Sequence, residues 1–523
     1  MEIIDNDKSE LDRGILLLAY ESDGDAIVEV ALKLRRKGFT PFIIFGAELS
    51  IYQNLTWHDR CREHEIPFST LRDAYDEYKS NKYNPDHNWL RFFEEQYCYS
   101  KSFNELIMTD PIIFRAHHNR SPYYKNLKPV QIYRWAECQT RLILRVFRKV
   151  NPVAVACIER SYFVKNVAAQ IALSQKIPAF SLIRSRIGKY CFWHPYFGLG
   201  GLKKPLPEYF GQKEVQEDSE FLQEAKGFSD SGQALYAAPS LEGGRRKPGI
   251  LKLVIDYLRT EYRAVRGLLK HLQNWMKGSL NRWSTDFSGS YLKVRVWHFL
   301  RILRSFSSKI SKIYDILPGQ NEPFILVPLH VLPESSTLTL GPEYYELNLV
   351  RKLSERIPPG INIYVKENPG MISLRTKKEI ALFRELPNVY FVSPYLDTSN
   401  MLNKAAGVMG ISGTALLEGA LLGKPVLAVG SPEFASGISH YTYNELDDFL
   451  SCCQKNKGKK VRIEKVFGYL ERISSEVFPL DFHLLFQPHK NSDIDYSTLT
   501  NRLMHLIKQD RLINILNEDI KLS

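Results

Sequence analysis

Residues 411–418 read ISGTALLE, and residues 423–429 read GKPVLAV. This pattern predicts the end of a buried strand, a tight polar turn, a short helix and a second buried strand. Gly413 lets the backbone approach a ligand closely, and the start of the helix offers N–H groups to an anion. Glu418 follows Thr414 by four residues, which places both on one face of the helix. Because open α/β sheets bind ligands at the carboxyl ends of parallel strands, we expect a ligand site at this turn.

The chain around this turn alternates between strand-like and helix-like segments, which is typical of a Rossmann-like domain. The predicted strands are residues 324–328, 361–365, 389–392, 407–411 and 425–429. Polar loops follow four of them, at residues 330–337, 366–371, 393–394 and 412–414. Loops after parallel strands emerge at one edge of the sheet, where they can form a binding cleft. We therefore assign residues 321–440 to a C-terminal Rossmann-like domain.

An earlier part of the chain has the same alternation. Residues 14–19 (GILLLA) and 39–45 predict buried strands, and residues 26–37 between them predict an amphipathic helix. The first turn lacks the GxGxxG pattern, so dinucleotide binding is not expected. Further strands are predicted at residues 153–158 and 177–183. Residues 1–240 are therefore assigned to an N-terminal Rossmann-like domain with a helical insertion.

A basic and aromatic stretch follows the last of these strands. Arg184, Arg186 and Lys189 precede residues 190–196, which read YCFWHPY. We interpret this stretch as a loop. A substrate surface and a simple lid or packing loop are both consistent with its composition.

The net charge of +12 is concentrated in one segment. Residues 245–313 contain 16 Lys or Arg against three acidic residues, which gives +13 and leaves the remainder close to neutral. Nucleic acid binding by the two domains is therefore not favoured. We assign residues 241–320 to a basic helical connector and residues 441–523 to a C-terminal helical segment. The connector helices either pack against a domain with a solvated basic face or lie on an anionic membrane surface.

Cysteine usage and hydrophobicity indicate the compartment. The seven cysteines form no CxxC pair and are odd in number, which argues against a disulfide framework or a zinc site. No run of about 18 apolar residues occurs, and the polar first residues do not form a secretory signal. We expect a cytoplasmic protein that associates peripherally with the inner face of the inner membrane.

Four motifs resemble those of a known family. They are PLH…PESST at residues 328–337, YVKENP at 364–369, PNV at 387–389, and SGTA…E…GKPV at 412–426. Together they resemble the capsule polysaccharide biosynthesis family, a branch of the GT-B glycosyltransferases that includes the bacterial Kdo transferases of capsule assembly. The resemblance is specific over about residues 322–435 and loose in the first domain.

This resemblance implies two Rossmann-like domains that face each other across a cleft, with the donor nucleotide on the C-terminal domain and the acceptor on the N-terminal one. It implies that Lys366 and the serine–threonine turn hold the donor phosphate and that Glu418 holds the ribose. No metal or cofactor is expected, because Lys, Arg and a helix N-terminus can neutralise the leaving phosphate. The expected donor-binding residues are His330, Ser335, Ser336, Lys366, Asn368, Pro369, Ser393, Ser412, Gly413, Thr414 and Glu418.

Alternatives remain for several of these residues. The turn could be purely structural, Glu418 could be a solvent-facing acid, and Lys366 could be an ordinary surface lysine. The family usually has Lys-Glu-His-Pro where this chain has Asn368 in the histidine position. Asparagine can donate a hydrogen bond but cannot carry charge or transfer a proton.

The catalytic candidates are carboxylates. Glu159 follows a predicted strand of the first domain and is placed to act as general base on an acceptor hydroxyl. Asp23 and Asp25 are rivals for that role. Glu334 is a candidate acid or base, or a helix cap.

The sequence therefore predicts a glycosyltransferase of bacterial capsule or other surface polysaccharide biosynthesis. Its expected partners are a CMP-, UDP- or GDP-linked sugar, a glycan or lipid-linked glycan acceptor, and an anionic membrane surface contacted by residues 245–313. Two alternatives are a non-catalytic nucleotide-sugar-binding subunit of a capsule assembly complex and a sugar-nucleotide epimerase.

Overall fold

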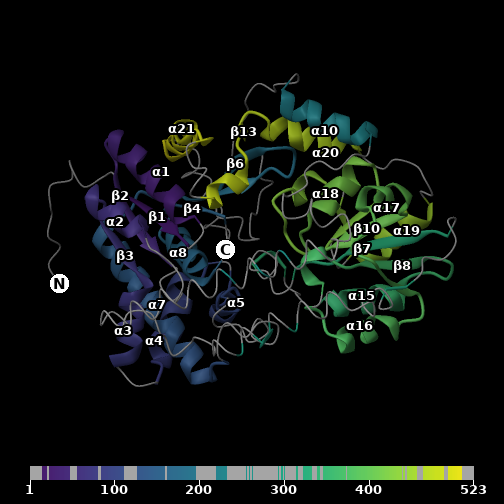
Figure 1. Ribbon diagram of the computed structural model, residues 1–523, viewed down its shortest axis with the longest axis horizontal. Coiled ribbons are helices and arrows are strands. Elements are labelled where there is room, and N and C mark those ends of the chain that lie inside the picture. Colours follow the sequence, from purple (N-terminus) through teal and green to yellow (C-terminus); the bar gives the residue numbers. More distant parts are fainter. Residues whose placement is uncertain are drawn as a thin grey trace.

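A computed structural model describes two α/β sheets with their helices (Figure 1). Structural statements below concern the residues that it describes. These are residues 14–20, 23–46, 56–80, 84–99, 101–110, 126–159, 162–195, 219–231, 255, 258, 262, 293, 296, 297, 300, 314–315, 322–331, 339–341, 346–372, 374–438, 440–441, 445–455, 463–487 and 493–508.

The first sheet has seven strands in the order β13-β6-β5-β4-β1-β2-β3. Strands β1 to β5 pair in parallel, whereas β6 and β13 are antiparallel to their neighbours. All six residues of β1 are buried, as expected for a strand covered on both faces. The strands are β1 (Gly14–Ala19), β2 (Thr40–Phe45), β3 (Phe68–Thr70), β4 (Ala154–Ile158), β5 (Ala179–Arg184), β6 (Tyr190–Pro195) and β13 (Phe478–Pro479).

Helices cover both faces of this sheet. Helix α1 lies on one face beside the C-terminal helix α21, and α7 and α8 lie on the other (Figure 1). Helix α7 begins with Pro129 and ends at Val150, and its C-cap Asn151 adopts a left-handed conformation. The helices are α1 (Gly24–Arg36), α2 (Thr56–Glu63), α3 (Leu71–Ser80), α4 (His87–Tyr97), α5 (Phe103–Met108), α7 (Pro129–Val150) and α8 (Phe163–Ser174).

The second sheet has six strands in the order β12-β11-β10-β7-β8-β9, and all of its pairings are parallel. This confirms the predicted Rossmann-like arrangement of the second domain. The strands are β7 (Phe324–Pro328), β8 (Asn362–Lys366), β9 (Val389–Val392), β10 (Gly407–Gly410), β11 (Val426–Ala428) and β12 (His440–Tyr441). The helices are α15 (Glu346–Arg356), η3 (Pro369–Met371), α16 (Lys377–Arg384), α17 (Thr398–Lys404), α18 (Thr414–Leu421), η4 (Ala435–Gly437) and α19 (Leu446–Lys455).

The chain crosses between the two domains more than once. Helix α10 (Glu220–Ser231) lies beside α18 of the second domain, and the Ser229 hydroxyl donates to the Leu421 carbonyl at 3.0 Å. Helix α20 (Ile463–Ile473) packs on α18 as well. The chain then returns to the first domain through β13, η6 (Phe482–Phe486) and α21 (Tyr496–Ile507), so that yellow ribbon lies beside purple helix α1 (Figure 1).

The structure corrects the interpretation of residues 190–196 as a loop. Residues 190–195 form strand β6, which pairs with β5 and β13. Trp193 is buried, and its indole N–H donates to the Leu499 carbonyl at 3.0 Å. The aromatic side chains therefore serve the core, because α21 covers them from a part of the chain 306 residues away.

The predicted basic connector, residues 241–320, falls largely outside the described residues. Seven positions between 255 and 300 are described, and each is helical. Within the described part of the chain, no helix combines the length and apolar character that crossing a bilayer requires.

Candidate functional site

Each sheet has a point where the chain reverses the direction in which it adds strands. In the second sheet, β8 and β9 extend from one side of β7, and β10, β11 and β12 extend from the other. The helices on the two sides then cover opposite faces, which leaves a crevice at the carboxyl ends of β7 and β10. His330 follows β7, and Ser412 follows β10. The predicted turn therefore lies at the position where an open α/β sheet binds its ligand.

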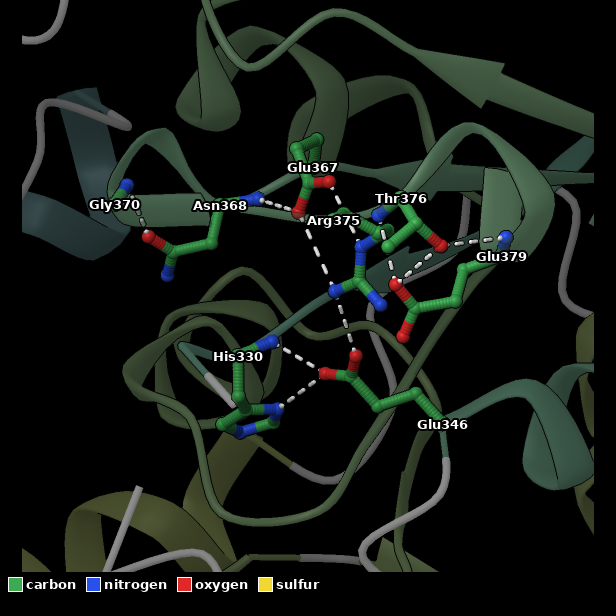
Figure 2. Close-up of polar contacts among 8 residues, drawn as sticks. All are labelled: His330, Glu346, Glu367, Asn368, Gly370, Arg375, Thr376 and Glu379. Atoms are coloured by element: carbon green, nitrogen blue, oxygen red, sulfur yellow. Dashed lines mark hydrogen bonds and ion pairs between the residues drawn. The ribbon is translucent and has the colours of Figure 1, made fainter. Parts of the chain in front are cut away.

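His330 and Ser412 are in contact at this point. The Nε2 atom of His330 accepts a hydrogen bond from the Ser412 backbone N–H at 3.4 Å. On the other side of the ring, Nδ1 lies 3.3 Å from the Glu346 carboxylate, which also accepts from the His330 backbone N–H (Figure 2). Both ring nitrogens are therefore engaged, Nδ1 by the Glu346 carboxylate and Nε2 by the Ser412 N–H.

A buried ionic network supports the imidazole from behind. Arg375 pairs with Glu346 at 3.0 Å and with Glu367 at 2.8 Å, and all three side chains are less than 5% exposed (Figure 2). Burial alone would raise the pKa of Glu346, but the hydrogen bond from His330 and the charge of Arg375 outweigh it and lower that pKa. The network joins the loops after β7 and β8 to α15, so it fixes the orientation of His330.

Asn368 has a structural role that explains its identity. Its side-chain oxygen accepts from the Gly370 backbone N–H at 2.9 Å and caps the short helix η3, which begins at Pro369. Its own backbone N–H donates to the Glu367 carboxylate at 2.8 Å. Asparagine is among the best residues at such a cap. With the oxygen engaged, the amide NH2 is the part of Asn368 that can serve a ligand.

Two further predicted residues lie at the carboxyl ends of β8 and β9. The Lys366 ammonium donates to the Pro394 carbonyl at 3.1 Å and is only 6% exposed, so it is not an ordinary surface lysine. The Ser393 hydroxyl accepts from the Tyr395 backbone N–H at 3.3 Å. Both residues therefore help to order the sheet edge beside His330.

The turn at Ser412 leads directly into α18. Gly413 is the N-cap of this helix, and no side chain of the described residues caps it. The Leu416 N–H donates to the Gly413 carbonyl at 3.1 Å, so the first two N–H groups of α18 are the ones that can meet another partner. Ser412 is buried, and Glu418 is 8% exposed. The alternative of a solvent-facing acid at Glu418 is therefore wrong, because the side chain is enclosed by the fold.

The first sheet has its own reversal point, between β1 and β4. Glu159 follows β4 there and has a φ of +56°. Of its rivals, Asp23 is buried and pairs with Lys165 at 2.7 Å, and Asp25 pairs with Arg60 at 3.3 Å. Both aspartates are thus bound to cations of their own domain.

The Asp23–Lys165 pair is held tightly. Asp23 accepts from the Tyr20 backbone N–H, and the Lys165 ammonium donates to the Ile158 carbonyl at 2.7 Å. Burial alone would lower the pKa of Lys165, but the Asp23 carboxylate outweighs it and raises that pKa. The pair therefore ties the loop after β1 to the helix after β4.

The carboxyl edges of the two sheets meet. Asn166, in the first turn of α8, donates to the Thr339 hydroxyl of the second domain at 3.4 Å. Arg186, in the turn between β5 and β6, reaches Thr414 at the start of α18, with 3.5 Å between Nη1 and Oγ1. The two Rossmann-like domains thus face each other with the carboxyl edges of their sheets.

Backbone strain concentrates at this junction. Six of the described non-glycine residues have a positive φ, and three of them, Glu65, Asn151 and Lys176, follow helix ends, where this conformation is common. The other three, Glu159, Tyr162 and Arg186, lie at the carboxyl edge of the first sheet. Of these, Tyr162 is the N-cap of α8. Residues held in sparsely populated backbone conformations cluster at functional sites. Nothing in the sequence pattern marks these three positions, because all have ordinary side chains.

Several predicted residues have no structural description. Glu334, Ser335 and Ser336 lie outside the described residues. In the part of the chain that is described, no group of three or more His, Cys, Asp or Glu residues is placed to hold a metal ion.

Comparison with known proteins gives matches of structure alone. No protein-family model matches the sequence, and no curated protein matches it. The chain is similar to Thermosulfurimonas dismutans KpsC, a beta Kdo 2,7 transferase, at 12% identity and a TM-score of 0.28 over 64% of this chain and 89% of that chain.

Two other solved structures have different activities. Neisseria meningitidis UDP-GlcNAc 2-epimerase, bound to UDP-GlcNAc, matches at 13% identity and a TM-score of 0.25 over 88% of this chain and 98% of that chain. The calicheamicin glycosyltransferase CalG4 matches at 13% identity and a TM-score of 0.20 over 92% and 97% of the two chains. At such identities and TM-scores, these likenesses do not distinguish between reactions.

Proposed function

We propose that this protein is a metal-independent glycosyltransferase of the GT-B type that acts in the synthesis of a bacterial surface polysaccharide. The observation that carries the proposal is the contact between the carboxyl edges of the two sheets. Asn166 and Arg186 of the first domain meet Thr339 and Thr414 of the second. A nucleotide sugar at the Ser412 turn would then lie opposite the first domain and its acceptor.

The second domain would hold the donor. The hydroxyls of Ser412 and Thr414 and the N–H groups at the start of α18 suit a phosphate, since the positive end of a helix dipole favours an anion. Glu418, one turn further along α18, would accept from ribose hydroxyls. Lys366 would add positive charge from the neighbouring strand end. Such a set stabilises the charge that develops on a departing nucleotide phosphate.

The first domain would hold the acceptor. In the proposed step, an acceptor hydroxyl oxygen attacks the anomeric carbon while the bond from that carbon to the phosphate oxygen breaks. The electron pair leaves with the nucleotide, and the hydroxyl proton passes to the Glu159 carboxylate as general base. Glu334 remains a further acid or base candidate.

A panel of CMP-, UDP- and GDP-linked sugars tests this proposal. Purified protein is mixed with each donor and with glycan acceptors, and thermal shift and released nucleotide are measured. Released nucleotide with a lengthened glycan supports transfer, whereas an altered sugar still attached to its nucleotide indicates an epimerase. If no donor binds and no donor is turned over, the proposal is contradicted.

One observation favours a second candidate, a subunit that binds a nucleotide sugar without catalysis. Asn368 replaces the histidine expected from the resemblance, and its oxygen is engaged in capping η3. The substitution Asn368→His distinguishes the two candidates. If the wild type is inactive and Asn368→His turns over donor, the protein is an enzyme that has lost its catalysis. In a wild type that already turns over, an unchanged rate removes this candidate.

We further propose that the protein is cytoplasmic and that residues 245–313 attach it to an anionic membrane. The segment carries 16 basic and three acidic residues. Five of its described apolar side chains are exposed and recur at helical spacing, whereas Trp297 is half-buried. The five are Ile255, Leu258, Tyr262, Val296 and Leu300. Sedimentation with anionic and neutral liposomes at low and high salt tests this. Equal binding to neutral liposomes would contradict it, because the attraction depends on charge.

A further inference from the structure

Arg186 belongs to the first domain but ends at the candidate donor site of the second. It lies in the turn between β5 and β6. Its Nε–H donates to the Glu433 carboxylate at 2.6 Å, and its Nη1 lies 3.5 Å from the Thr414 hydroxyl. Thr414 is the first residue of α18. A guanidinium from one domain is thus placed at the helix N-terminus of the other.

The surroundings hold this guanidinium in place. The Glu433 side chain is 2% exposed, and its backbone carbonyl accepts from the Tyr469 hydroxyl at 3.3 Å. The Arg186 backbone has a φ of +70°, which arginine rarely adopts. The turn therefore keeps an unfavourable backbone conformation at the residue whose side chain crosses between the domains. An ion pair with Glu433 alone would not require the guanidinium to extend to Thr414.

The guanidinium of Arg186 extends beyond this ion pair. Glu433 accepts from Nε, and Nη1 lies past it toward the Ser412–Thr414 turn. Guanidinium offers planar pairs of N–H groups, a geometry that matches two oxygens of a phosphate. The N–H groups of α18 and the Thr414 hydroxyl lie beside it and favour the same type of ligand.

We infer that Arg186 binds the phosphate of the donor nucleotide from the opposite domain. This inference rests on the proposed function and adds a residue that the donor-binding set lacked. Because Arg186 and α18 belong to different domains, a phosphate held between them links the two. Arg186 is a binding residue, so its loss weakens the binding of phosphate-containing ligands and leaves the binding of nucleosides unchanged.

The test compares nucleotides with their nucleosides. Binding of CMP, UDP and GDP, and of cytidine, uridine and guanosine, is measured by calorimetry for wild type, Arg186→Gly and Lys189→Ala. Glycine tolerates a φ of +70°, so Arg186→Gly removes the guanidinium while relieving the backbone. Lys189→Ala is the matched control, because Lys189 lies on the same turn and pairs with Asp481 instead.

We expect Arg186→Gly to weaken binding of the preferred nucleotide about 10- to 100-fold, as for the loss of a charged hydrogen bond. Nucleoside binding by this variant and nucleotide binding by Lys189→Ala should match wild type. Arg186→Lys, which keeps the charge without the planar pair of donors, should recover part of the loss.

Two results would overturn the inference while the proposed function stands. One is unchanged nucleotide affinity in Arg186→Gly. The other is an equal loss for nucleotide and nucleoside, which would show that Arg186 only positions the domains. A wild type that binds none of the nucleotides would overturn both the inference and the proposed function.

Discussion

His330 and Ser412 are 82 residues apart in the chain, and the His330 ring accepts a hydrogen bond from the Ser412 backbone N–H at 3.4 Å. This contact joins the two strands between which the second sheet reverses direction. It places an imidazole, a helix N-terminus and a buried ionic network at one point.

Replacing Gly413 by Ala should disturb His330. A Cβ at this position would lie 3.3 Å from Nε2 of His330, so the ring must move by a few tenths of an ångström. Gly413 has a φ of −70°, which alanine adopts easily, so the backbone itself is not strained. We expect nucleotide binding to weaken several-fold, on the order of 1 kcal/mol, as when one hydrogen bond is lost.

The control for that variant is Gly227→Ala. Gly227 lies in helix α10, and a Cβ added there would have no other atom within 4 Å. Alanine should therefore stabilise the helix by roughly 0.5–1 kcal/mol and leave binding unchanged. If His330 is the cause of the effect, Gly413→Ala should have no further effect in a His330→Ala background. An additive loss would contradict this explanation.

Glu346→Gln should change how stability depends on pH. The pKa of Glu346 is lowered below its ordinary value of 4.5 in the folded protein. Its carboxylate therefore stabilises the fold above about pH 4.5, and this contribution is lost as the pH falls through the folded pKa. Urea unfolding measured from about pH 3.5 to 7 should show a smaller loss at acid pH for Glu346→Gln than for wild type.

Glu367→Gln gives a comparison of opposite sign. Burial raises the pKa of Glu367, although Arg375 offsets part of the effect. A raised carboxyl pKa makes the folded state bind more protons, so stability from this group falls as the pH rises through 4.5 toward the folded pKa. If the free energy of unfolding depends on pH in the same way for Glu346→Gln and Glu367→Gln, the pKa values of the two carboxyls are not shifted in opposite directions.

Breaking the Asp23–Lys165 pair should be costly. Lys165→Met leaves a buried carboxylate without its cation, and the free energy of unfolding should fall by about 3–5 kcal/mol. Lys165→Met combined with Asp23→Leu should recover much of the loss, because neither charge is then left alone. The exposed Arg62–Asp59 pair is the control, and Arg62→Ala should cost at most about 1 kcal/mol. A small effect of Lys165→Met in urea unfolding would contradict the buried pairing.

Glu159→Asn tests the proposed general base. Asparagine tolerates a positive φ, so the variant removes the carboxylate while keeping a residue suited to the backbone at +56°. We expect kcat to fall about 10²- to 10⁴-fold with donor binding unchanged. Single-turnover rates and donor affinity should be measured on the same preparation. An unchanged kcat would exclude Glu159 as the base.

The sequence was a good guide to the second domain. Its strands are short apolar runs with polar residues after them, so their order along the chain predicted that His330, Lys366, Ser393 and Ser412 would share one edge. Parallel pairing then brought these loops together. The pattern could not predict that Lys366 and Glu418 are buried, because burial of a polar side chain depends on neighbours from distant segments.

The first domain shows where local pattern was insufficient. Residues 190–195 read as an aromatic loop, but β13 pairs with them from the far end of the chain. Asp23 read as a candidate base, but Lys165, 142 residues away, neutralises it. In the sequence, Arg186 was one of several cations after a predicted strand. Its backbone conformation and its contact with Thr414 could not be predicted, because both depend on the folded arrangement of the two domains.

The return of the chain to the first domain has a consequence for its synthesis. Strand β13 and helix α21 cover β6 and α1, and Lys33 of α1 donates to the Ser497 hydroxyl at 3.1 Å. On the ribosome, these partners emerge only after the whole second domain has been translated. The apolar surface around Trp193 therefore stays uncovered until residues 478–508 have been made, so the core of the first domain is completed after the second domain has been translated.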